Sequence, residues 1–487
     1  MTPPDRTVGA RTTAEINPIE AEHYGSKTLA VEPGGVDVVP LGERHGVPRQ
    51  MFWTWISPNL EFATIGVGIL GVLFFGLTFW QSVAAIILGT GLGSITHAIV
   101  SSWGPSSGMC QMVLSRTGFG FLGNALPAGI NAVVAGIGWF AVNSISGALA
   151  LHALVPPLAT GVCLVLVVAA MLLVAFMGHN LVHVFERYAL PVLATVFVLG
   201  ALVIFSKSNP GQAALPGGPS TIAGFLVMTG ATFGYTCGWN PYASDYTRYL
   251  PPGTGRPAGL YAGAGVFLSC VLLESAGAAM VSAVGSTAAL DPGVYTSVMP
   301  SVLGKLTLLC IALGAIAANA LNVYSGAMSF LAIGFRLAAR RARAVVAVVF
   351  GVAGLLVAFA GLDNAGANYE SFLLVISYWI GPWLGVVLVD RYLRRGSDVT
   401  GLLTDRGYRN WAGPIAMAVG MVLSIWLFSN QQRYVGPVPT AYPNAGDLTF
   451  EVGFVVAAGL YAVLFRVLPP RSATATAPAT TASPTRG

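Results

Sequence analysis

The chain has 487 residues, of which 55% are hydrophobic and only 9% are charged. A soluble domain carries roughly 25% charged residues, so this composition excludes an ordinary soluble protein and indicates a chain embedded in lipid. The net charge is +5, and its distribution along the chain predicts the orientation in the membrane.

Polar tails flank the apolar part of the chain. The first fifty residues are polar, and residues 1–40 show no hydrophobic periodicity. A cleaved signal peptide needs an early apolar stretch, so this tail is not one. Residues from 471 onward are rich in Ala, Thr and Pro, a composition typical of disorder. The sequence therefore predicts a tail over 1–50, a membrane domain over 51–470 and a second tail over 471–487.

The membrane domain contains twelve apolar segments long enough to cross a bilayer, which takes about 20 residues. Turn-forming or charged stretches separate them. The expected spans are 54–76, 80–101, 123–151, 155–177, 186–206, 220–242, 259–284, 301–333, 344–362, 369–389, 411–429 and 450–468.

Basic residues predict which side of the membrane each loop faces. With twelve spans and a cytoplasmic N-terminus, only Lys207, Lys305 and Arg433 of the 24 Lys and Arg residues fall on the outer side. Such an excess on one side is typical of cytoplasmic loops. The sequence thus predicts a multi-pass protein of the cell (plasma or inner) membrane with both termini in the cytoplasm.

Two of the spans carry helix-breaking residues. The first contains Ser57-Pro58-Asn59 and several glycines, and the sixth contains Gly238-Trp239-Asn240-Pro241. Unwound backbone inside a bilayer is tolerated where it lines protein or water, so such breaks indicate a binding site. Because the two spans are five apart, they fit two inverted five-helix repeats. The alternative is that these glycines and prolines only permit close helix packing.

Polar side chains in two other spans share helical faces. Trp139 and Asn143 are four residues apart in the third span, and Asn319 and Asn322 are three apart in the eighth. An indole face and amide edges suit a planar heterocycle with amide-like groups. The alternative is that these asparagines join neighbouring helices by hydrogen bonds.

Carboxylates occur inside two spans. Glu61 lies beside the expected break in the first span, and Glu274 lies near the middle of the seventh. An ionised carboxylate is costly at this depth, so both are candidates for cation coupling. Asp245 is close to Arg248 at the end of the sixth span, where an ion pair or a gate contact is the simpler interpretation.

Four segments resemble, in order and over roughly residues 40–430, the purine–cytosine permeases of the nucleobase–cation symporter family. They are Trp55-Ile56-Ser57-Pro58-Asn59 with the following Gly68-Ile69-Leu70-Gly71 and Gly76-Leu77-Thr78-Phe79-Trp80-Gln81-Ser82, then Gly138-Trp139-Phe140-Ala141-Val142-Asn143-Ser144, Ala243-Ser244-Asp245-Tyr246-Thr247-Arg248-Tyr249-Leu250-Pro251, and Asn319-Ala320-Leu321-Asn322-Val323-Tyr324-Ser325.

The resemblance implies an all-α membrane protein of about twelve helices with the leucine-transporter-like 5+5 inverted repeat, in which helices 1 and 6 are discontinuous. Carried over by position, Trp139 stacks on the base and Trp239 covers its other face. Ser57 lines the site from the first helix. Hydrogen bonds to the edge of the base come from Asn143, Asn319 and Asn322.

The chain departs from the family pattern at two of these positions. Leu321 replaces a proline of the fungal members, so the eighth span should be less kinked. Glu61 replaces a residue expected to be neutral, and we interpret it either as the carrier of the coupling proton or as an acceptor for N–H groups of the substrate. Sodium-coupled relatives use span-one carbonyls and span-eight hydroxyls, for which Ser325 and Ser329 are available.

The sequence therefore predicts a secondary transporter that imports cytosine or purines such as adenine, guanine and hypoxanthine by alternating access. The coupling cation is H⁺ in preference to Na⁺, and no cofactor, resident metal or catalytic residue is expected. The expected partners are the nucleobase and the lipid bilayer, without nucleic acid or an obligate protein partner. Motifs for hydrolases and nucleotide-binding loops are missing, which argues against an enzyme.

Several alternatives stay open at this stage. The substrate could be another heterocycle, such as allantoin, a hydantoin, uracil, a nucleoside, thiamine or a pyridoxine-like vitamin. A non-transporting nutrient receptor of the same fold would have the same sequence features. A channel is disfavoured because the sequence shows no repeated filter-like loop.

Overall fold

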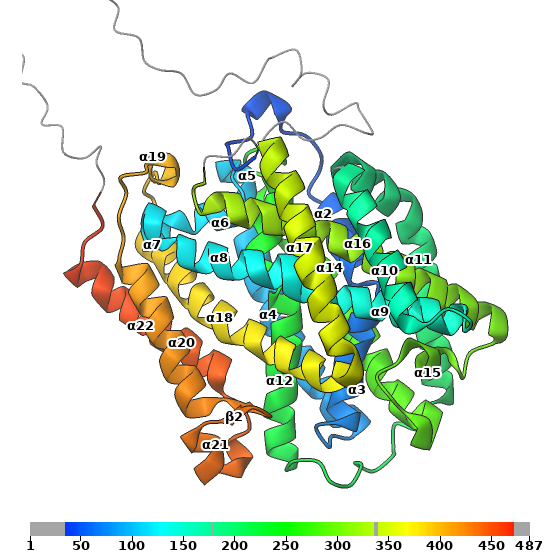
Figure 1. Cartoon of the computed structure of the whole chain (residues 1–487). Coiled ribbons are helices and arrows are strands. Elements are labelled where there is room, and N and C mark those ends of the chain that lie inside the picture. The colour runs from blue at the N-terminus through cyan, green and yellow to red at the C-terminus, as the bar shows by residue number, and fades with distance from the viewer. Residues whose placement is uncertain (1–34, 178, 336–338, 472–487) are drawn as a thin grey trace, which may run out of the picture.

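The computed structural model describes residues 35–177, 179–335 and 339–471, and these form one bundle of helices (Figure 1). In the described part of the chain, seven helices are long and apolar enough to cross a membrane, and a bent pair at residues 50–73 makes an eighth. Each of the twelve predicted spans coincides with helix, with ends that differ by several residues. The predicted all-α membrane architecture is therefore confirmed.

The first repeat begins with the bent pair and ends with two long helices. Its elements are α2 (Gln50–Ile56), η2 (Ser57–Asn59), α3 (Phe62–Leu73), α4 (Phe79–Ser101), α8 (Ala125–Val133), the π-helix η3 (Val134–Trp139), α9 (Phe140–Leu154), α10 (Thr160–Met177) and α11 (His179–Lys207). Three short helices join α4 to α8, namely α5 (Gly104–Ser107), α6 (Gln111–Leu114) and α7 (Arg116–Gly123).

The second repeat again begins with a broken helix. Its elements are α12 (Thr221–Cys237), η4 (Asn240–Tyr242), α13 (Ala243–Thr247), α14 (Gly255–Val284), η5 (Gly285–Thr287), α15 (Pro292–Thr296), α16 (Ser301–Ala332), α17 (Ala339–Gly361), η6 (Leu362–Asn364) and α18 (Ala365–Leu393). As Leu321 predicts, α16 runs without a break through the asparagine segment.

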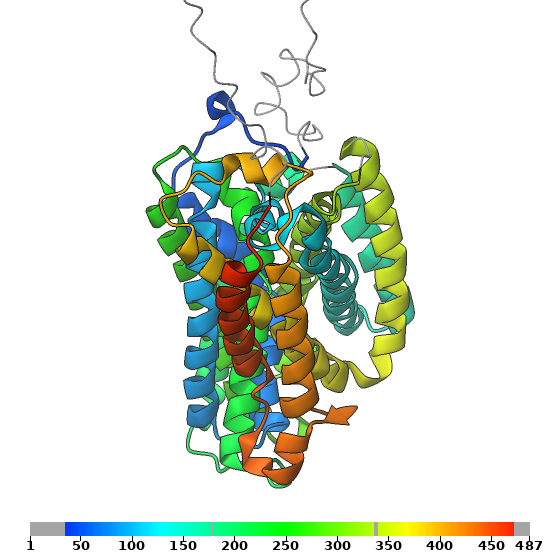
Figure 2. The same cartoon turned by 90° about the vertical axis from the view of Figure 1, so that its left-hand side faces the viewer.

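Two further membrane helices follow the repeats and lie side by side on one flank, as Figure 2 shows. The last elements are α19 (Thr400–Thr404), α20 (Ala412–Phe428), the hairpin strands β1 (Asn430–Gln431) and β2 (Tyr434–Val435), α21 (Pro437–Ala441), η7 (Pro443–Ala445) and α22 (Thr449–Val467).

Local sequence accounts for where these helices start and break. Thr78 and Gln81 form a capping box at the start of α4, in which each side chain accepts from the other residue's backbone N–H. Pro58 and Pro241 lie in the short 3-10 turns η2 and η4, where proline removes a backbone donor and interrupts the α-helix. The two broken helices follow from these residues.

Apolar side chains cover the outside of the bundle, and polar ones are buried within it. Ile95, Leu202 and Val302 are between 58% and 73% exposed, as expected for side chains that contact lipid. Ser57, Asn143 and Asn319, in contrast, are fully or almost fully buried. Buried polar residues inside a membrane domain mark a candidate functional site, and here they gather in the centre of the bundle.

Both described chain ends lie on the same side of the bundle, at the top of Figures 1 and 2. We call this the terminal side, and the end that carries the β1–β2 hairpin the opposite side. The predicted N-terminal tail is placed in part against the fold. Arg44 donates to the Pro105 carbonyl (2.8 Å), and Val39 is buried and donates its N–H to Gly108 O (2.9 Å). Residues of the predicted tail thus contact the fold ahead of residue 51, and residues 1–34 and 472–487 lie outside the described residues.

Candidate functional site

The candidate site lies where the two broken helices meet the middle of the bundle. The first span bends by 62° between α2–η2 and α3, and Glu61 there has an extended backbone (φ −154°, ψ 171°). Trp239 lies in the second break, between α12 and η4. On α16, a Cβ added at Gly314 would lie 2.4 Å from Leu60 O, so this glycine lets α16 approach the unwound backbone.

Two parallel indole rings form the aromatic part of the site. The rings of Trp139 and Trp239 have centroids 6.4 Å apart and an interplanar angle of 9°, and both side chains are buried. Tyr235 and Phe372 contact the Trp139 ring edge-on, with centroids 5.4 and 5.1 Å away. The Trp239 Nε1–H donates to Asn59 Oδ1 (3.0 Å). Flat aromatic faces held in this way are surfaces on which a heterocyclic base can stack.

Three asparagines converge on one hydrogen-bonded group beside these rings. The Nδ2 groups of Asn143 and Asn322 both donate to Asn319 Oδ1, over 3.0 and 3.2 Å. Asn319 Nδ2 in turn donates to Phe140 O (3.0 Å). The Oδ1 atoms of Asn143 and Asn322 are buried without a hydrogen-bond donor. Because a buried acceptor without a donor is costly, these two oxygens can accept from N–H groups of a ligand.

The two predicted carboxylates, Glu61 and Glu274, are both buried in the bundle. Glu61 Oε1 lies 3.5 Å from the Tyr235 hydroxyl, and its Oε2 has no partner. Thr90 Oγ1 donates to Glu274 Oε2 (2.9 Å), and Glu274 Oε1 has no partner. In the described part of the chain, no ion pair involves either residue. Both groups can therefore take up a cation or a proton.

The predicted hydroxyls lie in different places. Ser57 Oγ, in the first break, is buried without a partner, and η2 packs against α16. Ser325 lies eleven residues after Gly314, roughly 16 Å farther along α16, so it is not at the level of the break. Ser329 Oγ donates to Ser325 O and accepts from Asn131 Nδ2, which leaves it inside a helix contact. The geometry thus places Ser57 in the first break, whereas Ser325 and Ser329 lie on α16 beyond Asn322.

A cavity lies next to the site and extends to the β1–β2 hairpin on the opposite side. It has a volume of about 340 Å³ and is lined mainly by apolar residues of α3, α9, α17 and α18. Its lining includes Gly138 and Phe372 near Trp139, and Arg433 of the β1–β2 hairpin. We call this cavity the vestibule. Neither indole lines the vestibule, but Phe372, which does, contacts the Trp139 ring edge-on.

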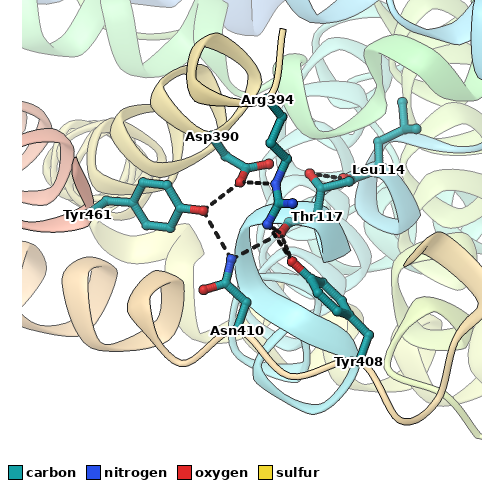
Figure 3. Close-up of polar contacts among 7 residues, drawn as sticks. All are labelled: Leu114, Thr117, Asp390, Arg394, Tyr408, Asn410 and Tyr461. Carbon is teal, nitrogen blue, oxygen red and sulfur yellow. Dashed lines mark hydrogen bonds and ion pairs between the residues drawn. The ribbon is translucent and has the colours of Figure 1, made fainter. Parts of the chain in front are cut away.

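On the terminal side, a polar network fixes the end of α18 (Figure 3). Asp390 accepts from Arg394 Nε (2.7 Å) and from the Tyr461 hydroxyl (2.5 Å). Asn410 Nδ2 donates to the Tyr461 hydroxyl (3.0 Å) and to Thr117 O (3.1 Å). The network joins α18 and α22 to the short helix α7. Hydrogen bonds thus link α7, α18 and α22 on the terminal side, and the vestibule lies on the opposite side.

Sequence reasoning missed several residues that contact the site. Asn59 belongs to the recognised Ser-Pro-Asn segment, but its partner Trp239 is 180 residues away. Tyr235 lies one turn before the second break, and its aromatic type at that position was a usable signal. Phe372 is an ordinary apolar residue of α18, and nothing in the sequence distinguishes it from lipid-facing neighbours.

Broken helices around buried polar groups, in a bundle with an apolar exterior, define a membrane transporter of the inverted-repeat type. A family model described as "Permease for cytosine/purines, uracil, thiamine, allantoin" matches residues 38–453. The chain belongs to this permease family, and it is a transporter and not an enzyme.

Individual relatives agree with this assignment. The putative purine-cytosine permease YxlA of Bacillus subtilis is 29% identical over 90% of this chain and 96% of its own length. The purine-cytosine permease fcyB of Emericella nidulans is 27% identical over 94% of this chain and 92% of its own length.

A solved structure supports the fold. Mhp1, described as a nucleobase-cation-symport-1 family transporter in a closed conformation with bromovinylhydantoin bound, has a TM-score of 0.69 and 18% identity. The match covers 90% of this chain and 96% of Mhp1. The expected inverted-repeat fold with discontinuous helices 1 and 6 is thereby confirmed.

Proposed function

We propose that this protein imports a nucleobase, namely cytosine or purines such as adenine, guanine and hypoxanthine, by symport with a cation, H⁺ in preference to Na⁺. The observation that carries the proposal is the parallel pair Trp139 and Trp239, whose faces suit a planar base. The purine–cytosine permeases among the relatives support this substrate class.

The amide group beside the indole rings would read the edge of the base. The free Oδ1 atoms of Asn143 and Asn322 are acceptors, and ring N–H and exocyclic amino groups of nucleobases are donors. Ser57 Oγ adds a group that can donate or accept from the broken first helix. A ligand that satisfies these atoms gains more than one that leaves them unpaired, which favours bases over purely apolar rings.

Coupling to a proton is supported by Glu61 and Glu274. Each is fully buried, and the described part of the chain offers neither of them a cationic partner. A buried carboxylate is costly as an anion unless a cation or a proton neutralises it. The hydroxyls expected for a sodium site, Ser325 and Ser329, are distant from the break. Transport would need no cofactor other than the coupling cation.

The direction of transport follows from the predicted orientation. Because basic residues concentrate in the loops of the terminal side, that side is assigned to the cytoplasm of the plasma or inner membrane. The vestibule then lies on the outer side, from which substrate would enter. Alternating access would next close the vestibule and open the terminal side.

The test is uptake of radiolabelled cytosine in cells without their own nucleobase permeases, with and without sodium and at acidic and neutral pH. Adenine, hypoxanthine, uracil, allantoin, thiamine and pyridoxine serve as unlabelled competitors. Saturable uptake that purines inhibit and acidity stimulates is expected. Good surface expression without cytosine uptake or purine competition would refute the substrate class.

Trp139→Leu locates the site in the same assay, because leucine fills much of the volume without offering an aromatic face. Loss of base stacking costs about 1–3 kcal/mol, so KM should rise about 5- to 150-fold. Trp379→Leu is the matched control, since Trp379 is equally buried but contacts Trp383 in α18. An equal change in both variants would show that Trp139 has no special role.

A further inference from the structure

A chain of buried hydrogen bonds joins Glu61 to the first break. The Thr64 hydroxyl lies 2.6 Å from Asn59 O and 2.6 Å from the Tyr235 hydroxyl. The Tyr235 hydroxyl lies 3.5 Å from Glu61 Oε1. All four side chains are at most 2% exposed, so water does not substitute for a missing partner.

Counting protons shows what this chain requires. Three contacts link the Asn59 carbonyl, Thr64, Tyr235 and Glu61, and each needs one proton to be a hydrogen bond. The two hydroxyls supply one proton each. The third proton is present when the Glu61 carboxyl is protonated, and then Glu61 donates to Tyr235, Tyr235 to Thr64, and Thr64 to Asn59 O.

An ionised Glu61 reverses this order. The carboxylate can only accept, so Tyr235 turns its proton toward Glu61, and Thr64 can satisfy either Tyr235 or Asn59 O but not both. Each hydroxyl keeps its own proton, and only the direction of donation changes. Loss of the proton on Glu61 therefore removes one hydrogen bond from the buried chain, at the break or beside it.

The far end of the chain holds a substrate-stacking ring. The side chain of Asn59 accepts from Trp239 Nε1 (3.0 Å) and donates to Trp55 O (2.8 Å) and Ser269 Oγ (3.1 Å). A change in the hydrogen bonding of the Asn59 backbone thus acts on the residue that orients Trp239. Tyr235 also contacts the other indole directly, edge-on to Trp139.

We propose that Tyr235 and Thr64 are positioning residues that transmit the charge state of Glu61 to Asn59 and Trp239, so that nucleobase affinity depends on protonation of Glu61. This inference rests on the proposed function. It adds the route by which proton and base favour the same state, which coupling requires.

Other titratable groups face Glu61 from the neighbouring helices. Tyr235 of α12 and Tyr369 of α18 interact electrostatically with Glu61, and Tyr369 interacts in turn with Cys270 and Glu274 of α14. Tyr369 donates to Ala63 O (2.8 Å), and Glu274 is bonded to Thr90, so neither takes part in the chain. From α16, Gly314 lies against the Glu61 side chain.

The test is binding of radiolabelled cytosine to the purified full-length protein at acidic and at neutral pH. The measured quantity is the ratio of the two dissociation constants. For the wild type this ratio should lie within the 5- to 150-fold range typical of coupled sites. Tyr235→Phe and Thr64→Val should each bring the ratio to one, as should Glu61→Gln. Thr64→Ser restores the hydroxyl and should restore the ratio.

Two matched control variants remove a tyrosine and a threonine hydroxyl that do not belong to the hydrogen-bonded chain from Glu61 to Asn59. The hydroxyls of Tyr242 and Thr236 are buried without hydrogen-bond partners. Tyr242→Phe and Thr236→Val should therefore keep the wild-type ratio. A purely structural role of Tyr235 would lower affinity equally at both pH values and leave the ratio unchanged.

The outcomes separate the two proposals. Glu61→Gln could abolish the pH dependence of binding while Tyr235→Phe and Thr64→Val keep it. In that case the proposed transmission through Tyr235 and Thr64 is wrong, and the proposal of nucleobase transport is retained. Wild-type binding that depends on sodium but not on pH would also overturn the proposed transmission through Tyr235 and Thr64. A wild type that binds and transports no nucleobase refutes the proposed function together with this inference.

Discussion

The contact between α3 and α14 depends on glycine, and its disruption is the most direct test of the fold. A Cβ at Gly277 of α14 would lie 1.9 Å from Ile65 O, and a Cβ at Gly68 of α3 would lie 1.6 Å from Glu274 O. Ordinary contact begins at 3.4 Å. Gly277→Ala must therefore push the two backbones apart by about 1.5 Å, or displace α3 with Glu61 at its start.

Overpacking of this kind costs about 1–3 kcal/mol. We expect Gly277→Ala to lower the thermal stability of the detergent-purified protein and to reduce uptake, because α3 forms one side of the first break. The matched control is Gly91→Ala in α4, where the nearest atom, Phe267 Cε2, is 3.8 Å away. That substitution should be neutral or slightly stabilising, since alanine favours a helix over glycine. Equal stability of the two variants would refute the backbone contact.

Three further predictions concern the site, the terminal side and the orientation. Asn143→Leu removes a free acceptor worth about 0.5–1.5 kcal/mol, so the KM for uptake should rise roughly 2- to 13-fold; an unchanged KM would show that this amide does not meet the substrate. Tyr461→Phe removes a hydrogen-bond donor to Asp390 and should lower the unfolding temperature without changing KM. Tyr434→Phe removes an exposed hydroxyl and should change neither the unfolding temperature nor KM. All five native cysteines are buried, so an impermeant maleimide should label Arg433→Cys in intact cells and Arg395→Cys only after lysis; the reverse pattern would refute the assigned orientation.

Much of the fold was predictable because each span carries its own signal. Length and apolarity mark a helix that crosses a bilayer, and Pro58 and Pro241 mark the two breaks locally. The helical face shared by Trp139 and Asn143 was also predictable, because both lie within or at the start of α9. These features depend on residues close together in the chain.

The rest depends on which helices are neighbours. Sequence spacing indicated two separate asparagine faces, and the bond between Asn143 and Asn319 that unites them joins residues 176 apart. The depth of Ser325 relative to the break was likewise not predictable, since it depends on how far α16 extends past Leu60. The contacts of residues 35–49 with the fold were not predictable either, because they are backbone and arginine hydrogen bonds, which leave no apolar pattern.

The π-helix before Trp139 has a consequence for helical phase. Asn131 of α8 and Asn143 of α9 are twelve residues apart, yet both bond to the same helix, α16, through Ser329 and Asn319. At about 100° per residue, a regular α-helix would point them roughly 120° apart. A π-bulge takes up one extra residue, which reduces the offset to about 20°. Loss of a single residue between 134 and 139 would therefore turn this stretch into regular α-helix and keep the offset near 20°. A regular α-helix at the present length would instead rotate Trp139 and Asn143 away from α16 together, so this short stretch should tolerate the loss of one residue better than the loss of its π-helical geometry.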